Sequence, residues 1–164
     1  MDLFILRHGL AEERDRKRYP DDGLRPLTIE GRKKLKKIAG RLKGFGYKFD
    51  LVLTSPLVRA GQTAEIAAGM LGIEDFVRQT AHLSPDGDPR KLVDEVVASR
   101  KDRVLLVGHE PYLSGLISVL LSGRSGLPIN LKKGGFCHLS VGSLRHGSCA
   151  ALDSLLAPRQ MIRN

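Results

Sequence analysis

Three short segments of the chain carry side chains that could act together on a phosphate group. Arg7 and His8 follow a short apolar run, Arg59 follows "TSP" at 54–56, and His109 lies in "VGHEP" at 107–111. Two arginines can bind a phosphate through paired N–H groups, and a neutral histidine can attack phosphorus through a ring nitrogen. A second histidine, if protonated, would stabilise charge on the equatorial oxygens. These residue types indicate phosphoryl transfer through a phosphohistidine intermediate, with no metal required.

Each of these segments ends a predicted strand, at residues 2–6, 50–56 and 103–111. Their apolar runs are typical of strands buried on both faces of a parallel sheet. In such sheets ligands bind beyond the carboxyl ends of the strands, so parallel neighbours would bring both histidines and both arginines to one edge. The N-termini of the helices that follow residues 56 and 111 would add N–H donors.

The remaining pattern alternates helices with strands. Helices are predicted from Thr28 to Gly44 or Gly46, over 57–71, from an Asp88 cap to Ser99 and over 112–122, and strands over 76–80, 134–141 and 148–153. Residues 10–27 are polar, contain two prolines and read as a loop. This order predicts an α/β fold, a three-layer sandwich with a mostly parallel central sheet and helices on both faces. The length of 164 residues predicts a single domain over 1–164.

The composition favours a cytoplasmic protein that binds anions. The net charge is +9 and the pI about 9.9, which attracts phosphates, nucleic acids and acidic protein surfaces. Nucleic acid is the less favoured partner, because the lysines of residues 33–37 fit a solvated helix face and no basic stretch is interleaved with aromatics. No apolar run is long enough to span a membrane, and the N-terminus lacks the pattern of a signal peptide.

The same three segments resemble the signatures of the histidine phosphatase superfamily, which includes phosphoglycerate mutases. They are "LRHG" at 6–9, "LTSPLVRAGQTAE" at 53–65 and "VGHEP" at 107–111. The short chain, "RPLTIEGR" at 25–32 and "LSPDGDP" at 83–89 are similar to the SixA type of protein-histidine phosphatase. The resemblance extends from residue 2 to about residue 141. It implies a phosphoglycerate mutase-like fold without a large cap insertion.

Roles for the site residues follow from this resemblance. It implies that His8 is the nucleophile, that Arg7 and Arg59 bind the phosphoryl group, and that His109 completes the phosphate pocket. It also implies that Gly9 lets the backbone approach the ligand closely, with a strand-ending turn as the alternative. No cofactor and no metal are expected.

The chain departs from the mutases at two positions. In the mutases an asparagine follows the RHG after a few residues, whereas that neighbourhood here consists of Glu12, Glu13 and Arg14. The stretch that carries a general acid in many relatives reads "LSPDGD". Asp86, Asp88 and Glu110 are candidates for that acid. Turn and cap roles are the alternatives for the two aspartates, and a charge at a helix N-terminus is the alternative for Glu110. Glu110 is also counted among the phosphate-binding candidates.

A weak general acid suits a leaving group that departs easily, as phosphohistidine does. An open site also favours a phosphate displayed on a protein. We therefore expect hydrolysis of phosphohistidine on a protein, with an HPt-like domain as a candidate partner. A phosphatase for small phosphomonoesters and a non-catalytic phosphate- or phosphoprotein-binding module are the alternatives. The sequence leaves open whether loop 10–25 closes over the substrate.

Overall fold

The computed structural model describes residues 1–162, which form one six-stranded sheet in the order β3-β2-β4-β1-β5-β6. The strands are β1 (Asp2–Arg7), β2 (Leu51–Thr54), β3 (Val77–Gln79), β4 (Arg103–Gly108), β5 (Phe136–Val141) and β6 (Ala150–Leu156). The pairs β1–β4, β2–β4 and β2–β3 are parallel, whereas β5 is antiparallel to both β1 and β6. The predicted parallel neighbours therefore lie side by side, with β4 between β1 and β2.

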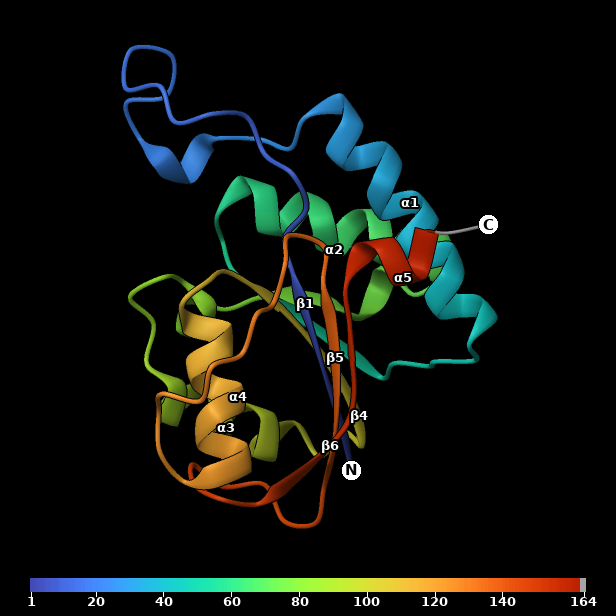
Figure 1. The fold of residues 1–164 in the computed structure, drawn as a ribbon, viewed down its shortest axis with the longest axis vertical. Helices are drawn as coiled ribbons and strands as arrows, with labels where there is room; N and C mark the ends of the chain where they lie inside the picture. The colour runs from blue at the N-terminus through green and yellow to red at the C-terminus, as the bar shows by residue number, and fades with distance from the viewer. Residues whose placement is uncertain (163–164) are drawn as a thin grey trace.

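Helices cover both faces of this sheet (Figure 1). They are α1 (Ile29–Gly44), α2 (Val58–Leu71), α3 (Pro89–Ser99), α4 (Tyr112–Ser122) and α5 (Pro158–Ile162). Buried residues of α1, α2 and α5 pack on one face, and those of α3 and α4 pack on the other. The predicted three-layer α/β sandwich is confirmed, and the elements between residues 1 and 162 include no inserted cap domain.

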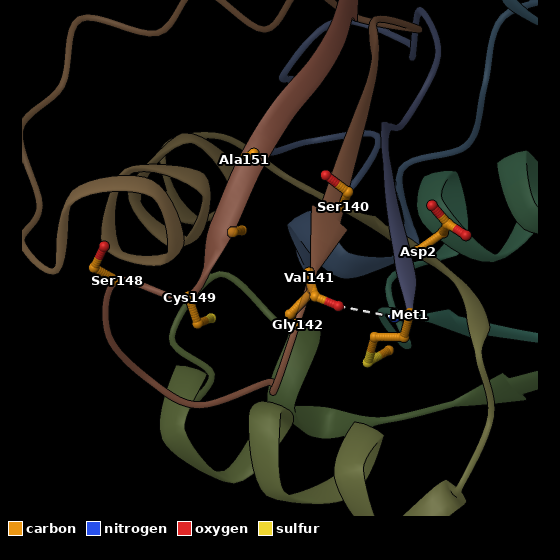
Figure 2. A pocket seen from close by; sticks show the side chains of 9 residues that line it. Met1, Asp2, Ser140, Val141, Gly142, Ser148, Cys149 and Ala151 are labelled. Atoms are coloured by element: carbon orange, nitrogen blue, oxygen red, sulfur yellow. Dashed lines mark hydrogen bonds between the residues drawn. The ribbon is translucent and has the colours of Figure 1, made fainter.

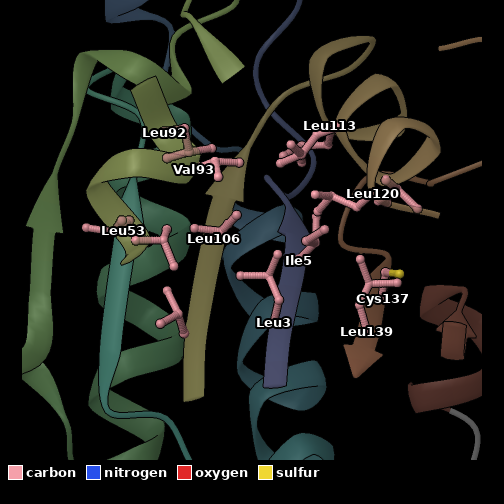
Figure 3. Close-up of a cluster of buried hydrophobic side chains, with 14 of the residues drawn as sticks. Leu3, Ile5, Leu53, Leu92, Val93, Leu106, Leu113, Leu120, Cys137 and Leu139 are labelled. Carbon is pink, nitrogen blue, oxygen red and sulfur yellow. The ribbon is translucent and has the colours of Figure 1, made fainter. Parts of the chain in front are cut away.

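Side chains along the central strands point alternately to the two faces of the sheet, so they divide the core into two layers. Leu3 and Ile5 of β1 join the layer under α3 and α4, whereas Phe4 and Leu6 join the layer under α1 and α2. Figure 3 shows the first layer, in which Leu92 and Leu113 meet Leu106 of β4. Because both faces of β1 and β4 are covered, these strands form a rigid base for the residues at their carboxyl ends.

The structure confirms the predicted N-cap residues of two helices, α1 and α3. The hydroxyl of Thr28 accepts a hydrogen bond from the N–H of Gly31 at 2.9 Å. The carboxylate of Asp88 accepts from the N–H groups of Arg90 and Lys91, with Pro89 at the first helical position. Asp88 is therefore a structural cap of α3.

The chain end differs from the predicted pattern. The strand expected at 148–153 runs instead from Ala150 to Leu156, because β6 is an edge strand that tolerates the polar Asp153 and Ser154. The short helix α5 was not predicted, since five residues are too few to show a helical period. Among residues 1–162, no helix has both the length and the apolar character needed to cross a bilayer.

Candidate active site

A cavity of about 650 Å³ opens at the carboxyl ends of β1 and β4. Its lining includes Arg7, His8, Arg59 and His109, the four residues that the sequence analysis expected to converge. Loop 10–25, the blue segment that projects past the strand ends in Figure 1, forms another wall. The tertiary structure thus gathers residues separated by as many as 102 positions in the chain, from 7 to 109.

The backbone around His8 is held from three sides. The N–H of His8 donates to the carbonyl of Gly108 in β4 at 3.0 Å, and the N–H of Gly134 donates to the carbonyl of His8 at 3.1 Å. The N–H of Gly9 donates to the hydroxyl of Thr63 in α2 at 3.1 Å. These contacts fix the direction in which the imidazole leaves the strand end.

The His8 ring is oriented by its own neighbour. Its Nδ1 lies 2.7 Å from the carbonyl oxygen of Gly9, which can only accept, so Nδ1 carries the proton. The other nitrogen, Nε2, is then unprotonated in the neutral ring and carries the lone pair. The pKa of His8 is lowered to about 3, mainly by burial and also by the nearby His109, Arg59 and Arg7, while the hydrogen bond with Gly9 raises it. At neutral pH His8 therefore has the form that a nucleophile needs.

His109 faces His8 across the cavity, with ring centroids 5.1 Å apart. Its Nε2 lies 2.8 Å from the hydroxyl of Ser55, while its Nδ1 is buried without a hydrogen-bond partner. Burial, followed by the charges of Arg59 and Arg7, lowers the pKa of His109 to about 4. His109 is therefore neutral at pH 7 in these surroundings, and a bound phosphoryl group would supply the negative charge that favours its protonation.

The two predicted arginines are held in place and keep free donors. Arg7 donates through Nη1 to the carbonyl of Leu131 at 3.0 Å, and the Arg59 side chain is only 5% exposed. The Nε of each arginine is buried without a partner. Buried donors of this kind are rarely left unpaired. Together with the unpaired Nδ1 of His109, they make the cavity fit an oxyanion.

Six further charged residues that sequence reasoning did not assign to the site line the cavity: Glu12, Glu13, Arg14, Asp22, Arg25 and Lys133. Arg25 is 8% exposed and donates to the carbonyl of Glu12 at 2.7 Å. Asp22 forms ion pairs with Arg59 and Arg25. Burial is the largest cause that lowers the pKa of Lys133, and the nearby charges of Arg7, Arg25 and Arg59 lower it as well. Among Asp22, Arg25 and Lys133, only Arg25 had a signal, as the first residue of "RPLTIEGR".

The remaining candidates are placed as follows. Glu110 lines the cavity and accepts from the N–H of Ser114 at 2.8 Å, so it also caps α4. Asp86 and Asp88 are not among the cavity residues. Gly9 does not line it either: a Cβ there would lie 2.6 Å from Cδ1 of Leu35, so a larger residue would force this side chain of α1 to shift. The close approach expected at Gly9 is thus to a helix of this chain.

Potential metal ligands gather elsewhere. Within residues 1–162, the one group of three that could share an ion is Asp2, His138 and Asp153, near the amino end of β1. There His138 bonds to Asp2 at 2.8 Å and stacks on Phe4, as expected for a packed or hydrogen-bonded histidine. A second cavity adjoins this end, where the amine of Met1 donates to the carbonyl of Val141 (Figure 2). No arginine or histidine lines it, so its chemistry differs from that of the strand-end cavity.

Comparison with known proteins shows which proteins the chain resembles. A model of the histidine phosphatase superfamily (branch 1) matches residues 3–83. An uncharacterised protein of Picosynechococcus sp. is 40% identical over 149 residues, 88% of each chain. Phosphohistidine phosphatase SixA of Escherichia coli K12 is 33% identical over 132 residues, 76% of this chain and 77% of its own. A solved structure of the protein histidine phosphatase SixA complexed with tungstate has a TM-score of 0.83 at 26% identity, covering 96% of this chain and 97% of its own.

Proposed function

This chain belongs to the histidine phosphatase superfamily, and we propose that it hydrolyses phosphohistidine on a partner protein without a metal. The observation that carries the proposal is the state of His8. Its Nδ1 proton is committed to the carbonyl of Gly9, and its low pKa leaves Nε2 free to attack. Arg7, Arg59 and His109 surround the position of the phosphoryl group.

The proposed reaction has two steps. In the first, the Nε2 lone pair of His8 attacks phosphorus, the bond from phosphorus to the partner's imidazole nitrogen breaks, and that nitrogen takes a proton from solvent. In the second, water attacks the phosphoryl group on His8. Inorganic phosphate leaves and the neutral His8 ring is restored. Arg7 and Arg59 stabilise the charge of the transferring group in both steps.

The choice of phosphohistidine rests on the lack of a free carboxyl group among Asp86, Asp88 and Glu110 at the cavity, and on the relatives. Among the three carboxylates considered, only Glu110 lines the cavity, and it is engaged in capping α4. A phosphoramidate leaving group needs less help from an acid than an alcohol does. The SixA relative is named a phosphohistidine phosphatase, and its structural counterpart binds tungstate, a tetrahedral oxyanion like phosphate. The proposed partner is an HPt-like domain, and the expected compartment is the cytoplasm.

A small-molecule phosphatase is the second candidate function. A cavity of about 650 Å³ has room for a small phosphomonoester, and Glu12, Glu13 and Glu110 at its wall are carboxyl groups that could protonate an alcohol. A kcat/KM for sugar phosphates or para-nitrophenyl phosphate above that for a phosphohistidine domain would favour this candidate.

The first prediction concerns His8. We expect His8→Asn to lower turnover of a phosphohistidine domain by about 10⁴-fold or more, because the covalent route is lost. The wild type, quenched during turnover with ³²P-labelled substrate, should carry an acid-labile label on His8. His146→Asn, in the β5–β6 connection outside the cavity, is the matched control and should keep full activity. EDTA should leave the rate unchanged.

Other results would redirect the assignment. Normal activity of His8→Asn would refute His8 as the nucleophile, and inhibition by EDTA would contradict the metal-free route. If no phosphate compound is hydrolysed and no label is trapped, a phosphate- or phosphoprotein-binding module becomes the better reading.

A further inference from the structure

Asp22 brings a negative charge into the phosphate-binding cavity. It belongs to loop 10–25 and begins a short 3-10 turn over Asp22–Leu24. Its Oδ2 lies 3.1 Å from Nη2 of Arg59, and its Oδ1 lies 3.0 Å from Nε of Arg25. Its main-chain carbonyl also accepts from Nη1 of Arg59 at 2.9 Å. Asp22 therefore binds both terminal nitrogens of a guanidinium that the proposed function assigns to the phosphoryl group.

The buried Arg59 side chain cannot move away from Asp22 to bind a second anion elsewhere. The side chain is 5% exposed, so it cannot swing out of the cavity to escape the carboxylate. Its Nε is buried without a partner, and the residue lines the cavity in which an oxyanion would bind. A phosphoryl group on Arg59 would therefore share the guanidinium with Asp22. Like charges that share one cation repel each other.

Asp22 is also ionised at neutral pH. The hydrogen bond from Arg25, with the charges of Arg59, Arg25 and Arg14, holds the pKa of Asp22 below its usual range. Three other carboxylates line the cavity, those of Glu12, Glu13 and Glu110. Asp22 alone among these four forms an ion pair with a residue assigned to the phosphoryl group.

We infer that Asp22 is a specificity-determining residue that competes with oxyanions for Arg59 and lowers the affinity of the site for free phosphates. This inference rests on the proposed function, since it takes the cavity to bind a phosphoryl group. Product phosphate and small phosphomonoesters depend on the cavity alone for their affinity. A phosphohistidine domain gains further contacts outside the cavity, which offset the competition. Asp22 thus favours product release and discriminates against small phosphates.

The test measures binding without turnover. Titration calorimetry with inorganic phosphate and with tungstate compares the wild type with Asp22→Asn. The amide keeps an oxygen that accepts from a guanidinium but removes the charge, so we expect the Kd for each anion to fall by about tenfold. Asp21→Asn is the matched control, because the Asp21 carboxylate accepts only from the N–H of Gly23 and forms no ion pair within residues 1–162. Its Kd should equal that of the wild type.

A second neutral variant keeps the inference testable if Asp22→Asn does not fold. Asp22→Ser removes the charge with a smaller side chain, and it should tighten binding in the same direction. An unchanged or larger Kd in a folded neutral variant would overturn the inference and make Asp22 a residue that only positions Arg59. If the wild type binds neither phosphate nor tungstate, the proposed function fails instead, so the two failures are distinguishable.

Discussion

His8 and His109 are two buried bases surrounded by cations, and this environment keeps both neutral. Burial is the largest cause for each, and the arginines add to it. In the proposed reaction a neutral His8 attacks, whereas His109 gains a proton when an anion binds. The proposal gives the two histidines different roles because Nδ1 of His8 is bonded to Gly9 and Nδ1 of His109 is left without a partner.

These pKa values predict how stability depends on pH. The folded chain resists protonation of His8 and His109 until the pH approaches about 3 and about 4, whereas the unfolded chain takes up these protons near pH 6.5. Acid therefore favours unfolding: the contribution is fully present above pH 6.5 and is lost as the pH falls toward the folded values. Between pH 8 and pH 5, each histidine should lower the free energy of unfolding by about 2 kcal/mol.

Urea denaturation at the two pH values checks this expectation. In His8→Asn, the loss of stability between pH 8 and pH 5 should be smaller than in the wild type by about 2 kcal/mol. The comparison of the two differences removes the effect of the substitution itself at pH 8. An equal loss in both proteins would mean that His8 is not held neutral by the fold.

At the scale of elements, α1 supports the catalytic segment by close packing. Gly31 lies in the first turn of this helix, where a Cβ would overlap the backbone carbonyl oxygen of Leu10. That carbonyl also accepts from the N–H of Thr28, the N-cap of the helix. The start of α1 and the chain that follows His8 are therefore built against each other, and loop 10–25 leaves the site from this junction.

The contact makes Gly31→Ala a test of the junction. Because the obstructing atom belongs to the backbone, we expect the substitution to lower the free energy of unfolding by about 3 kcal/mol and to reduce kcat/KM by moving Leu10. The matched control is Gly40→Ala in the same helix, where the nearest atom to a Cβ is Cε of Met70 at 3.8 Å. It should raise stability by up to about 1 kcal/mol. Equal effects of the two substitutions would refute the proposed role of the junction.

At the scale of the whole molecule, one sheet links two hydrophobic layers. Leu105 and Leu106 are neighbours in β4, yet they belong to opposite layers. Disrupting either layer therefore exposes one face of the strands that carry His8 and His109. Stability and the geometry of the site depend on the same central strands.

This shared sheet predicts that the chain unfolds as one unit, in keeping with a single domain over 1–164. Differential scanning calorimetry should give one transition with equal calorimetric and van't Hoff enthalpies. Val107→Ala and Leu106→Ala, adjacent residues of β4 that face opposite layers, should both lower the Tm of that transition without splitting it. Two resolved transitions in either variant would contradict a single cooperative unit.

The sequence by itself indicated most of the elements and the four residues that the structure brings to one cavity. Apolar runs that end at "RHG", "TSP" and "GHE" predict strands, and the chemistry of Arg7, His8, Arg59 and His109 is a property of residue type. Those signals are local, because each depends on neighbours along the chain. The caps at Thr28 and Asp88 are local in the same way, and both are confirmed.

Only the tertiary structure decided what surrounds those residues. Asp22 meets Arg59 across 37 positions of sequence, and Arg7 meets the carbonyl of Leu131 across 124. Such contacts depend on how loops return to the sheet edge, which no periodicity in the sequence records. The neutral state of His8 and His109 is equally tertiary, since burial causes it. For the same reason, "RHGLAEER" predicts a nucleophile and a phosphate ligand, but not the carboxylate of Asp22 that binds Arg59.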